Sequence, residues 1–149
     1  MKIEGEYLFD GAREEVWKLV RDPEVLMKCM PGTQTVNKIS DAEFTGEVTV
    51  RIGPFSGTFA GRVIVSEEVP PQSCTLTVEG TGRIGFLKGV GSIAMSEPEA
   101  KKTLMKYTGE AQIGGKVASV GQRLFDSVSK SMVKQGLDTL NEILKSRTA

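Results

Sequence analysis

The chain has 149 residues, of which 39% are hydrophobic and 26% charged, and its 19 Lys plus Arg residues balance 19 Asp plus Glu residues. This length predicts one domain over residues 1–149, and the even charge argues against a dedicated nucleic-acid binder, which needs a basic excess. No histidine occurs, so the commonest general base and metal ligand is absent, and we expect no metal and no cofactor.

The two cysteines, Cys29 and Cys74, form no CxxC pair, which predicts two free thiols in a reducing compartment. No apolar run approaches the roughly 20 residues of a membrane-spanning helix, and the first residues do not resemble a signal peptide. The sequence therefore predicts a cytoplasmic protein.

The N-terminal part of the chain predicts one strand followed by two short helices. Polar and apolar residues alternate over residues 2–9, which indicates a half-buried strand. Asp10 is suited to cap a helix over residues 12–21. The Asp-Pro pair that follows ends this helix, and its proline begins a second helix over residues 23–29. A turn is expected at residues 30–32.

Residues 33–113 predict an antiparallel meander, because apolar and polar side chains alternate with period two between short turns. We expect turns at Gly53-Pro54, at Pro70-Pro71 and at Glu97-Pro98-Glu99. Residues 80–85 match the GxGxxG motif, which binds dinucleotides only where a helix opens after it. No helix start follows here, so we interpret these glycines as bends between strands and expect no nucleotide.

The last stretch, residues 114–147, contains no proline and predicts one long helix. Its first apolar stripe consists of Val117, Val120, Leu124 and Val128, and Gln135 continues it. The later apolar residues lie about 140° further round the helix; they are Val133, Leu137, Leu140 and Leu144. Either this is a core helix with a wide apolar face, or its first half closes over a cavity while its second half packs elsewhere. Gly136 lies near the change of face and allows a bend.

The element order predicts an α+β architecture in which a curved antiparallel sheet of about seven strands wraps around the long C-terminal helix. An apolar pocket is expected between helix and sheet. Its predicted lining consists of Trp17, Leu26, Met30, Phe59, Met95, Tyr107, Leu124, Val128 and Gln135. For each apolar residue of this set, the alternative is an ordinary place in the core; for Gln135, it is exposure to solvent.

Three stretches of the sequence carry a family likeness. They are Val16-Trp17 with residues 22–24 and the Pro31-Gly32 turn, the run 53–61 (GPFSGTFAG), and residues 107–111 (YTGEA) leading to 114–124 (GGKVASVGQRL). The third is the most specific, since Gly-Gly followed by Gly-Gln-Arg-Leu is no generic helix start. On these stretches, and over nearly its whole length, the chain resembles the CoxG family, named after a subunit of carbon monoxide dehydrogenase, within the START/Bet v 1-like (SRPBCC) group.

This resemblance implies a helix-grip fold with an internal hydrophobic cavity. It also implies a link to molybdenum-containing carbon monoxide dehydrogenases or related hydroxylases, and peripheral contact with the inner face of the membrane. The family offers no catalytic residues to carry over. Similar sequences are expected to have a bulky aromatic residue where this chain has Gly136, which implies looser packing at that position.

The sequence therefore predicts a non-enzymatic carrier or adaptor that holds a quinone- or lipid-like molecule and serves a redox enzyme. Two alternatives stay open, because a fold alone does not decide a function: an assembly factor without a ligand, and a cyclase- or hydratase-like enzyme. An elongated, lined cavity favours the carrier, and a filled cavity favours the assembly factor. A buried acid beside a tyrosine favours the enzyme.

Overall fold

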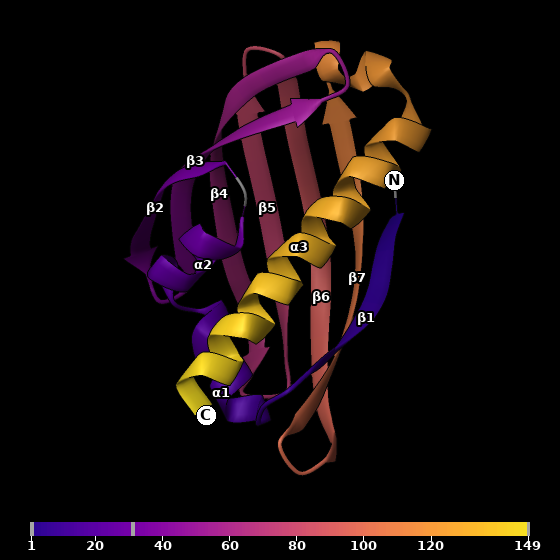
Figure 1. The fold of residues 1–149 in the computed structure, drawn as a ribbon. Coiled ribbons are helices and arrows are strands. Elements are labelled where there is room, and N and C mark those ends of the chain that lie inside the picture. The colour runs from indigo at the N-terminus through magenta and orange to yellow at the C-terminus, as the bar shows by residue number, and fades with distance from the viewer. Residues whose placement is uncertain (1, 31, 149) are drawn as a thin grey trace.

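The computed structural model describes residues 2–30 and 32–148, so Pro31, in the middle of the turn expected at residues 30–32, lies outside the described part. The elements follow one another in the expected order (Figure 1). They are β1 (Lys2–Phe9), α1 (Arg13–Val20), α2 (Pro23–Cys29), β2 (Thr33–Ser40), β3 (Glu43–Ile52), β4 (Phe55–Val69), β5 (Ser73–Gly82), β6 (Gly85–Glu99), β7 (Lys102–Gly114), the 3₁₀ helix η1 (Lys116–Val120) and α3 (Gln122–Thr148).

The strands form one seven-stranded sheet in the order β1-β7-β6-β5-β4-β3-β2. Every neighbouring pair is antiparallel, so the predicted meander is confirmed, and β1 closes the sheet by pairing with β7. The sheet curves around α3, which crosses its concave face diagonally, while α1 and α2 lie beside the C-terminal half of α3 (Figure 1). The predicted α+β helix-grip architecture is therefore confirmed.

Two local predictions are wrong. The turn expected at Glu97-Pro98-Glu99 lies instead at residues 100–101, because the proline falls within a register irregularity of the β6–β7 hairpin, where its missing N–H breaks no ladder bond. Asp10 does not cap α1, which begins after Ala12. Its carboxylate instead pairs with Lys102 and accepts a hydrogen bond from Asn141.

The C-terminal helix begins later than the sequence predicts. Two glycines with positive φ, Gly115 at 83° and Gly121 at 90°, divide the stretch, so Val117 and Val120 lie on η1 rather than on the helix. From Gln122 onward α3 runs for 27 residues without a break, through Gly136. At 1.5 Å per residue it is about 40 Å long.

The main core lies under the C-terminal half of α3. There α1, α2, the lower ends of the strands and α3 bury one apolar cluster, formed by Phe9, Val16, Leu19, Val25, Cys29, Met95, Met105, Leu140 and Leu144. A smaller cluster of Phe44, Val65 and Cys74 lies beside it, and Trp17 packs against both. The two thiols are free, as predicted. Both are also buried, and burial raises the pKa of each.

Gly136 is a point of close approach rather than of loose packing. A methyl group at this position would lie 3.1 Å from the carbonyl oxygen of Cys29, at the end of α2. The space in which an aromatic side chain was expected is therefore occupied by the backbone of α2, and the predicted loosening is wrong.

Candidate ligand-binding groove

The concave face of the sheet is packed at one end and open at the other. The core fills the end under the C-terminal half of α3, whereas most apolar residues on the same face toward the other end are only half-buried. The half-buried residues are Val48, Val50, Phe55, Phe59, Val78, Leu87 and Ile113. Ile52, at the end of β3, and Val117, on η1, are buried at this end. The first half of α3 therefore does not complete a closed core. This arrangement favours the second interpretation of its apolar pattern, in which the first half closes over a cavity while the second half packs elsewhere.

Glycines on the same face leave space beneath the helix. Gly61 pairs with Gly80, and Gly91 pairs with Gly109. The nearest atoms that a methyl group at any of these positions, or at Gly89, would meet within 4 Å all belong to neighbouring strands. The helix approaches the sheet most closely at β1 and β3. The middle of the sheet thus has no side chains reaching up to α3 at these positions.

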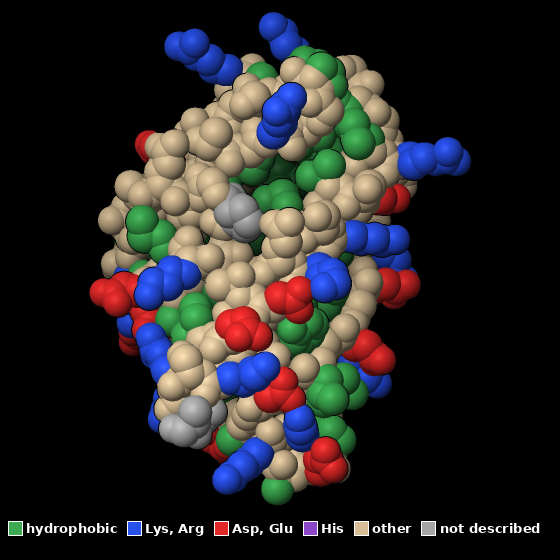
Figure 2. All heavy atoms as spheres, in the orientation of Figure 1, with side chains coloured by type: hydrophobic (Ala, Val, Ile, Leu, Met, Phe, Trp, Pro, Cys, Tyr) green, Lys and Arg blue, Asp and Glu red, His purple; other side chains and the backbone are tan. Residues whose placement is uncertain are grey.

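A groove of about 480 Å³ opens between α3 and the edge of β3. It forms because β2 pairs with β3 only as far as Val48, opposite Thr33. One edge of the last residues of β3 is therefore left without a neighbouring strand, while the other edge stays paired with β4. Its lining consists of Gly32, Thr49, Val50, Arg51, Ser127, Val128, Ser131, Met132 and Gln135. Figure 2 shows this side of the molecule hollowed beside the N-terminal half of α3, with hydrophobic side chains inside.

The groove has an apolar wall and polar groups at its rim. Val50, Val128 and Met132 supply the apolar surface. Arg51 and Gln135 are exposed, and within the described part of the chain neither side chain has a hydrogen-bond or ion-pair partner. A molecule with an apolar body and a polar head matches this arrangement, because its body would contact the apolar wall and its head would contact the polar side chains.

The family model for CoxG, a carbon monoxide dehydrogenase subunit, matches residues 5–145. This chain belongs to the CoxG family. No curated protein matches it.

Solved structures show the fold of this CoxG-family chain in other proteins. A conserved protein from Geobacillus kaustophilus is 27% identical over 98% of this chain and 96% of that chain, with a TM-score of 0.93. The Zhui aromatase/cyclase from Streptomyces sp. R1128 is 12% identical, covers 100% and 96% of the two chains and has a TM-score of 0.76. A START superfamily protein from Mycobacterium smegmatis is 11% identical over 97% of each chain, with a TM-score of 0.73. The CoxG chain therefore has the START/Bet v 1-like fold.

The predicted lining residues are spread over several places in the CoxG chain. Val128 and Gln135 line the groove, Phe59 lies on the open part of the concave face, and Leu124 lies on α3 over Gly53. Trp17, Leu26 and Tyr107 are half-buried at the boundary of the packed core. Met95 is 4% exposed within that core, and Met30 is 43% exposed at the end of α2.

Sequence reasoning missed six side chains of the groove, among them Ser127 and Ser131. Met132 had a usable signal, since it follows Leu124 and Val128 at four-residue steps on the same stripe. Val50, Arg51 and Thr49 had none, because they border the groove only where β2 ends, and the alternation within β3 does not show where its neighbour stops.

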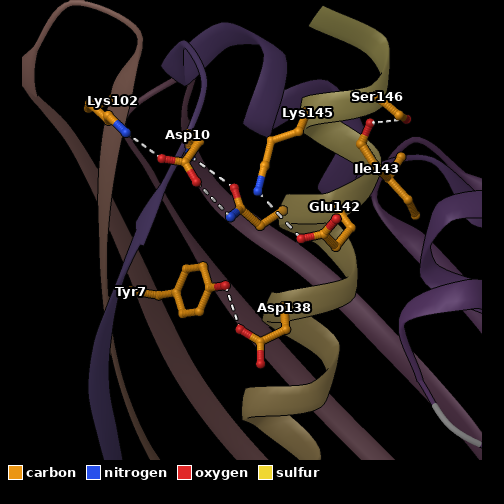
Figure 3. A network of polar contacts seen from close by, with 9 residues as sticks. Tyr7, Asp10, Lys102, Asp138, Glu142, Ile143, Lys145 and Ser146 are labelled. Carbon is orange, nitrogen blue, oxygen red and sulfur yellow. Dashed lines mark hydrogen bonds and ion pairs between the residues drawn. The ribbon is translucent and has the colours of Figure 1, made fainter. Parts of the chain in front are cut away.

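A polar network fixes the C-terminal half of α3 to β1 (Figure 3). Tyr7 donates a 2.6 Å hydrogen bond to Asp138, which also pairs with Lys134 at 2.8 Å. Burial, and then the bond to Asp138, raise the pKa of Tyr7 to about 12. The hydrogen bond from Lys134, and then that from Tyr7, lower the pKa of Asp138.

One turn further along, Asn141 bridges the same elements. Its side-chain oxygen accepts from the backbone N–H of Asp10 at 2.9 Å, and its amide donates to the Asp10 carboxylate at 3.0 Å. Hydrogen bonds from Lys102 and from Asn141 lower the pKa of Asp10. The second half of α3 is therefore held by polar bonds as well as by the core.

Two kinds of site are not formed by the residues that the structure describes. These residues contain no group of three or more Cys, Asp or Glu side chains placed to hold a metal ion. Nor does any described helix combine the length and the apolar character needed to cross a membrane.

Proposed function

We propose that this CoxG-family chain is a non-enzymatic carrier that holds an apolar, quinone- or lipid-like molecule between α3 and the sheet. The observation that supports this is the division of the concave face into a packed half and an open apolar half. Water in contact with apolar surface costs about 25 cal/mol per Å², so a bound apolar molecule would stabilise the open half. The groove volume of about 480 Å³ lies within the range of roughly 300–1,000 Å³ that small-molecule sites occupy.

We further propose that the carrier serves a molybdenum-containing enzyme of the carbon monoxide dehydrogenase type and works beside a membrane. Support comes from the family to which the chain belongs. A ligand-free assembly factor is the weaker alternative, because it would be expected to fill its interior rather than leave glycines under the helix.

The enzyme alternative rests on one observation, the pairing of Tyr7 with Asp138. The Asp138 side chain is 48% exposed and ion-paired with Lys134, and its lowered pKa keeps it ionised. A general acid needs the opposite environment, which raises the pKa of a carboxyl group toward neutrality. We therefore assign this pair to the attachment of α3 rather than to catalysis.

Native mass spectrometry with lipid extraction, on protein purified from its source, tests the carrier. Gly80→Leu would fill the open half, since a methyl at Gly80 meets only Phe59, at 3.9 Å or more. We expect a severalfold lower fraction of ligand-bound protein and an unchanged fold. Ala60→Leu, on the exposed outer face of β4, is the matched control and should keep its ligand. A wild-type protein that carries nothing and binds neither quinones nor fatty acids would contradict the proposal.

A further inference from the structure

One end of the molecule carries basic charge only. This basic end comprises residues 50–58 around the β3–β4 turn, 80–87 around the β5–β6 turn, and 112–125 from the end of β7 through η1 into α3. It contains no Asp or Glu, and its four cations are Arg51, Arg83, Lys116 and Arg123. The chain has 19 cations and 19 carboxylates in all, so the remainder holds 15 cations (19 − 4) against 19 carboxylates.

The fold brings these three segments together. Alternate turns of an antiparallel meander lie at the same end of the sheet. The backbone N–H of Val117 in η1 donates a 2.7 Å hydrogen bond to the carbonyl oxygen of Ile84 in the β5–β6 turn. Leu124 lies close over Gly53 in the β3–β4 turn. Figure 2 shows Lys and Arg side chains projecting from this end, at the top of the view.

The cations of the basic end are not neutralised from within the chain. All four are exposed, and none forms an ion pair with any residue that the structure describes. Elsewhere several cations are paired, as Arg62 is with Glu79 and Lys102 with Asp10. The charge of the basic end is therefore available to a partner.

Apolar side chains are exposed among these cations. Phe86 is 40% exposed and Leu124 is 37% exposed. Phe86 lies across Gly114, where any side chain would displace its ring, so the glycine allows the ring to stay at the surface. Basic groups beside protruding apolar groups fit an anionic headgroup layer with an acyl layer beneath it. A nucleic acid or an acidic protein would match the charge but would leave the apolar groups without this second layer.

We propose that the basic end docks the protein onto an anionic lipid surface. This inference rests on one part of the proposed function, the work beside a membrane, and names the surface that would meet the lipid; it does not depend on the identity of the ligand. The two are joined by Arg51, which belongs to the basic end and also lines the groove. Docking through this end would bring the mouth of the groove close to the lipid headgroups.

Sedimentation with vesicles tests the docking surface. We expect the wild-type protein to bind vesicles that contain phosphatidylglycerol, to ignore vesicles of phosphatidylcholine alone, and to dissociate in high salt. Each Lys or Arg near an anionic surface contributes about fivefold to binding, so Arg83→Gln with Lys116→Gln should weaken binding by about 25-fold. Neither residue lines the groove, and neither has an ion-pair partner within the described residues, so the fold should be retained.

Lys101→Gln with Lys106→Gln is the matched control, since both lysines are exposed and lie outside the basic end. This variant loses the same charge and should bind within about twofold of wild type, because screening confines the effect to nearby charges. Wild-type protein that ignores anionic vesicles, binds both lipids equally, or responds equally to both double variants would overturn the inference. Ligand occupancy, measured by native mass spectrometry before vesicles are added, should be equal in the wild type and both double variants, so a failed carrier and a failed docking surface give different results.

Discussion

Gln135 interrupts the apolar stripe of α3 with an amide that lines the groove and has no hydrogen-bond partner among the described residues. Gln135→Leu should weaken binding of a quinone or fatty acid by about 0.5–1.5 kcal/mol, the usual net value of one hydrogen bond. Because the side chain is exposed, the free energy of unfolding should barely change. Isothermal titration calorimetry measures the affinity. Gln112→Leu, on the exposed outer face of β7, is the control, and equal affinity in all three proteins would exclude the contact.

Tyr7 makes the free energy of unfolding fall as the pH rises in the alkaline range. Its pKa rises from 10.0 to about 12 on folding, so the stability it contributes is complete below pH 10 and is lost as pH rises toward 12. Tyr7→Phe should lower the free energy of unfolding by about 1 kcal/mol at neutral pH, through loss of the bond to Asp138, and should flatten this alkaline decline. Urea unfolding across the pH range measures both effects; an equally steep decline in the variant would contradict the assignment.

Among elements, α3 combines a fixed half and a half that spans open space. Leu144 is 1% exposed in the core, whereas Leu124 is 37% exposed beside the β3–β4 turn. Leu144→Ala should therefore cost about 2–5 kcal/mol of unfolding free energy, the range for buried leucines, and Leu124→Ala less than about 1 kcal/mol. Denaturant titration of the two variants compares the unfolding free energies for the same Leu→Ala change at two positions of one helix. Similar costs would show that both halves are packed alike.

Substitutions at Gly136 test how closely α2 approaches α3. Replacing a mid-helix glycine with alanine gains about 1 kcal/mol of helix propensity, but here the new methyl would lie 3.1 Å from the Cys29 carbonyl oxygen. We expect the two effects to nearly cancel in Gly136→Ala, whereas Gly136→Phe should clearly lower the melting temperature. An aromatic residue that raised it would mean that α2 moves aside easily.

The sequence predicted the order and type of the elements well, but it predicted poorly which residues of different elements lie together. Period-two alternation located the strands, and the Asp-Pro pair located the boundary between α1 and α2, because both signals are local. The late start of α3 depends on the positive φ of Gly115 and Gly121, which a glycine permits but does not require. The groove depends on where β2 ends, and the cap expected from Asp10 was replaced by partners 92 and 131 residues away. Such long-range contacts leave no periodic trace in a single sequence.

On the scale of the whole molecule, packing and polar bonds are concentrated at one end of the sheet. Amide hydrogen exchange should therefore be slower in residues 137–147 than in residues 122–132, since exchange follows local opening. A ligand in the groove should slow amide exchange in residues 122–132, because these residues border the groove along much of their length. Exchange in residues 137–147 should stay nearly unchanged. Equal protection of both segments without ligand would contradict this division.

The pairing of the first strand with the last strand has a consequence for synthesis. β1 lies against β7, Tyr7 bonds to Asp138 across 131 residues, and Leu140 and Leu144 complete the core. A growing chain on the ribosome cannot form these contacts until the last turns of α3 have emerged. Until then the apolar face of the meander has no helix to cover it, and exposed strands of this kind are prone to aggregate. Cooperative folding of this domain should therefore begin only after α3 has left the ribosome, and chains truncated before α3 should depend on chaperones to stay in solution.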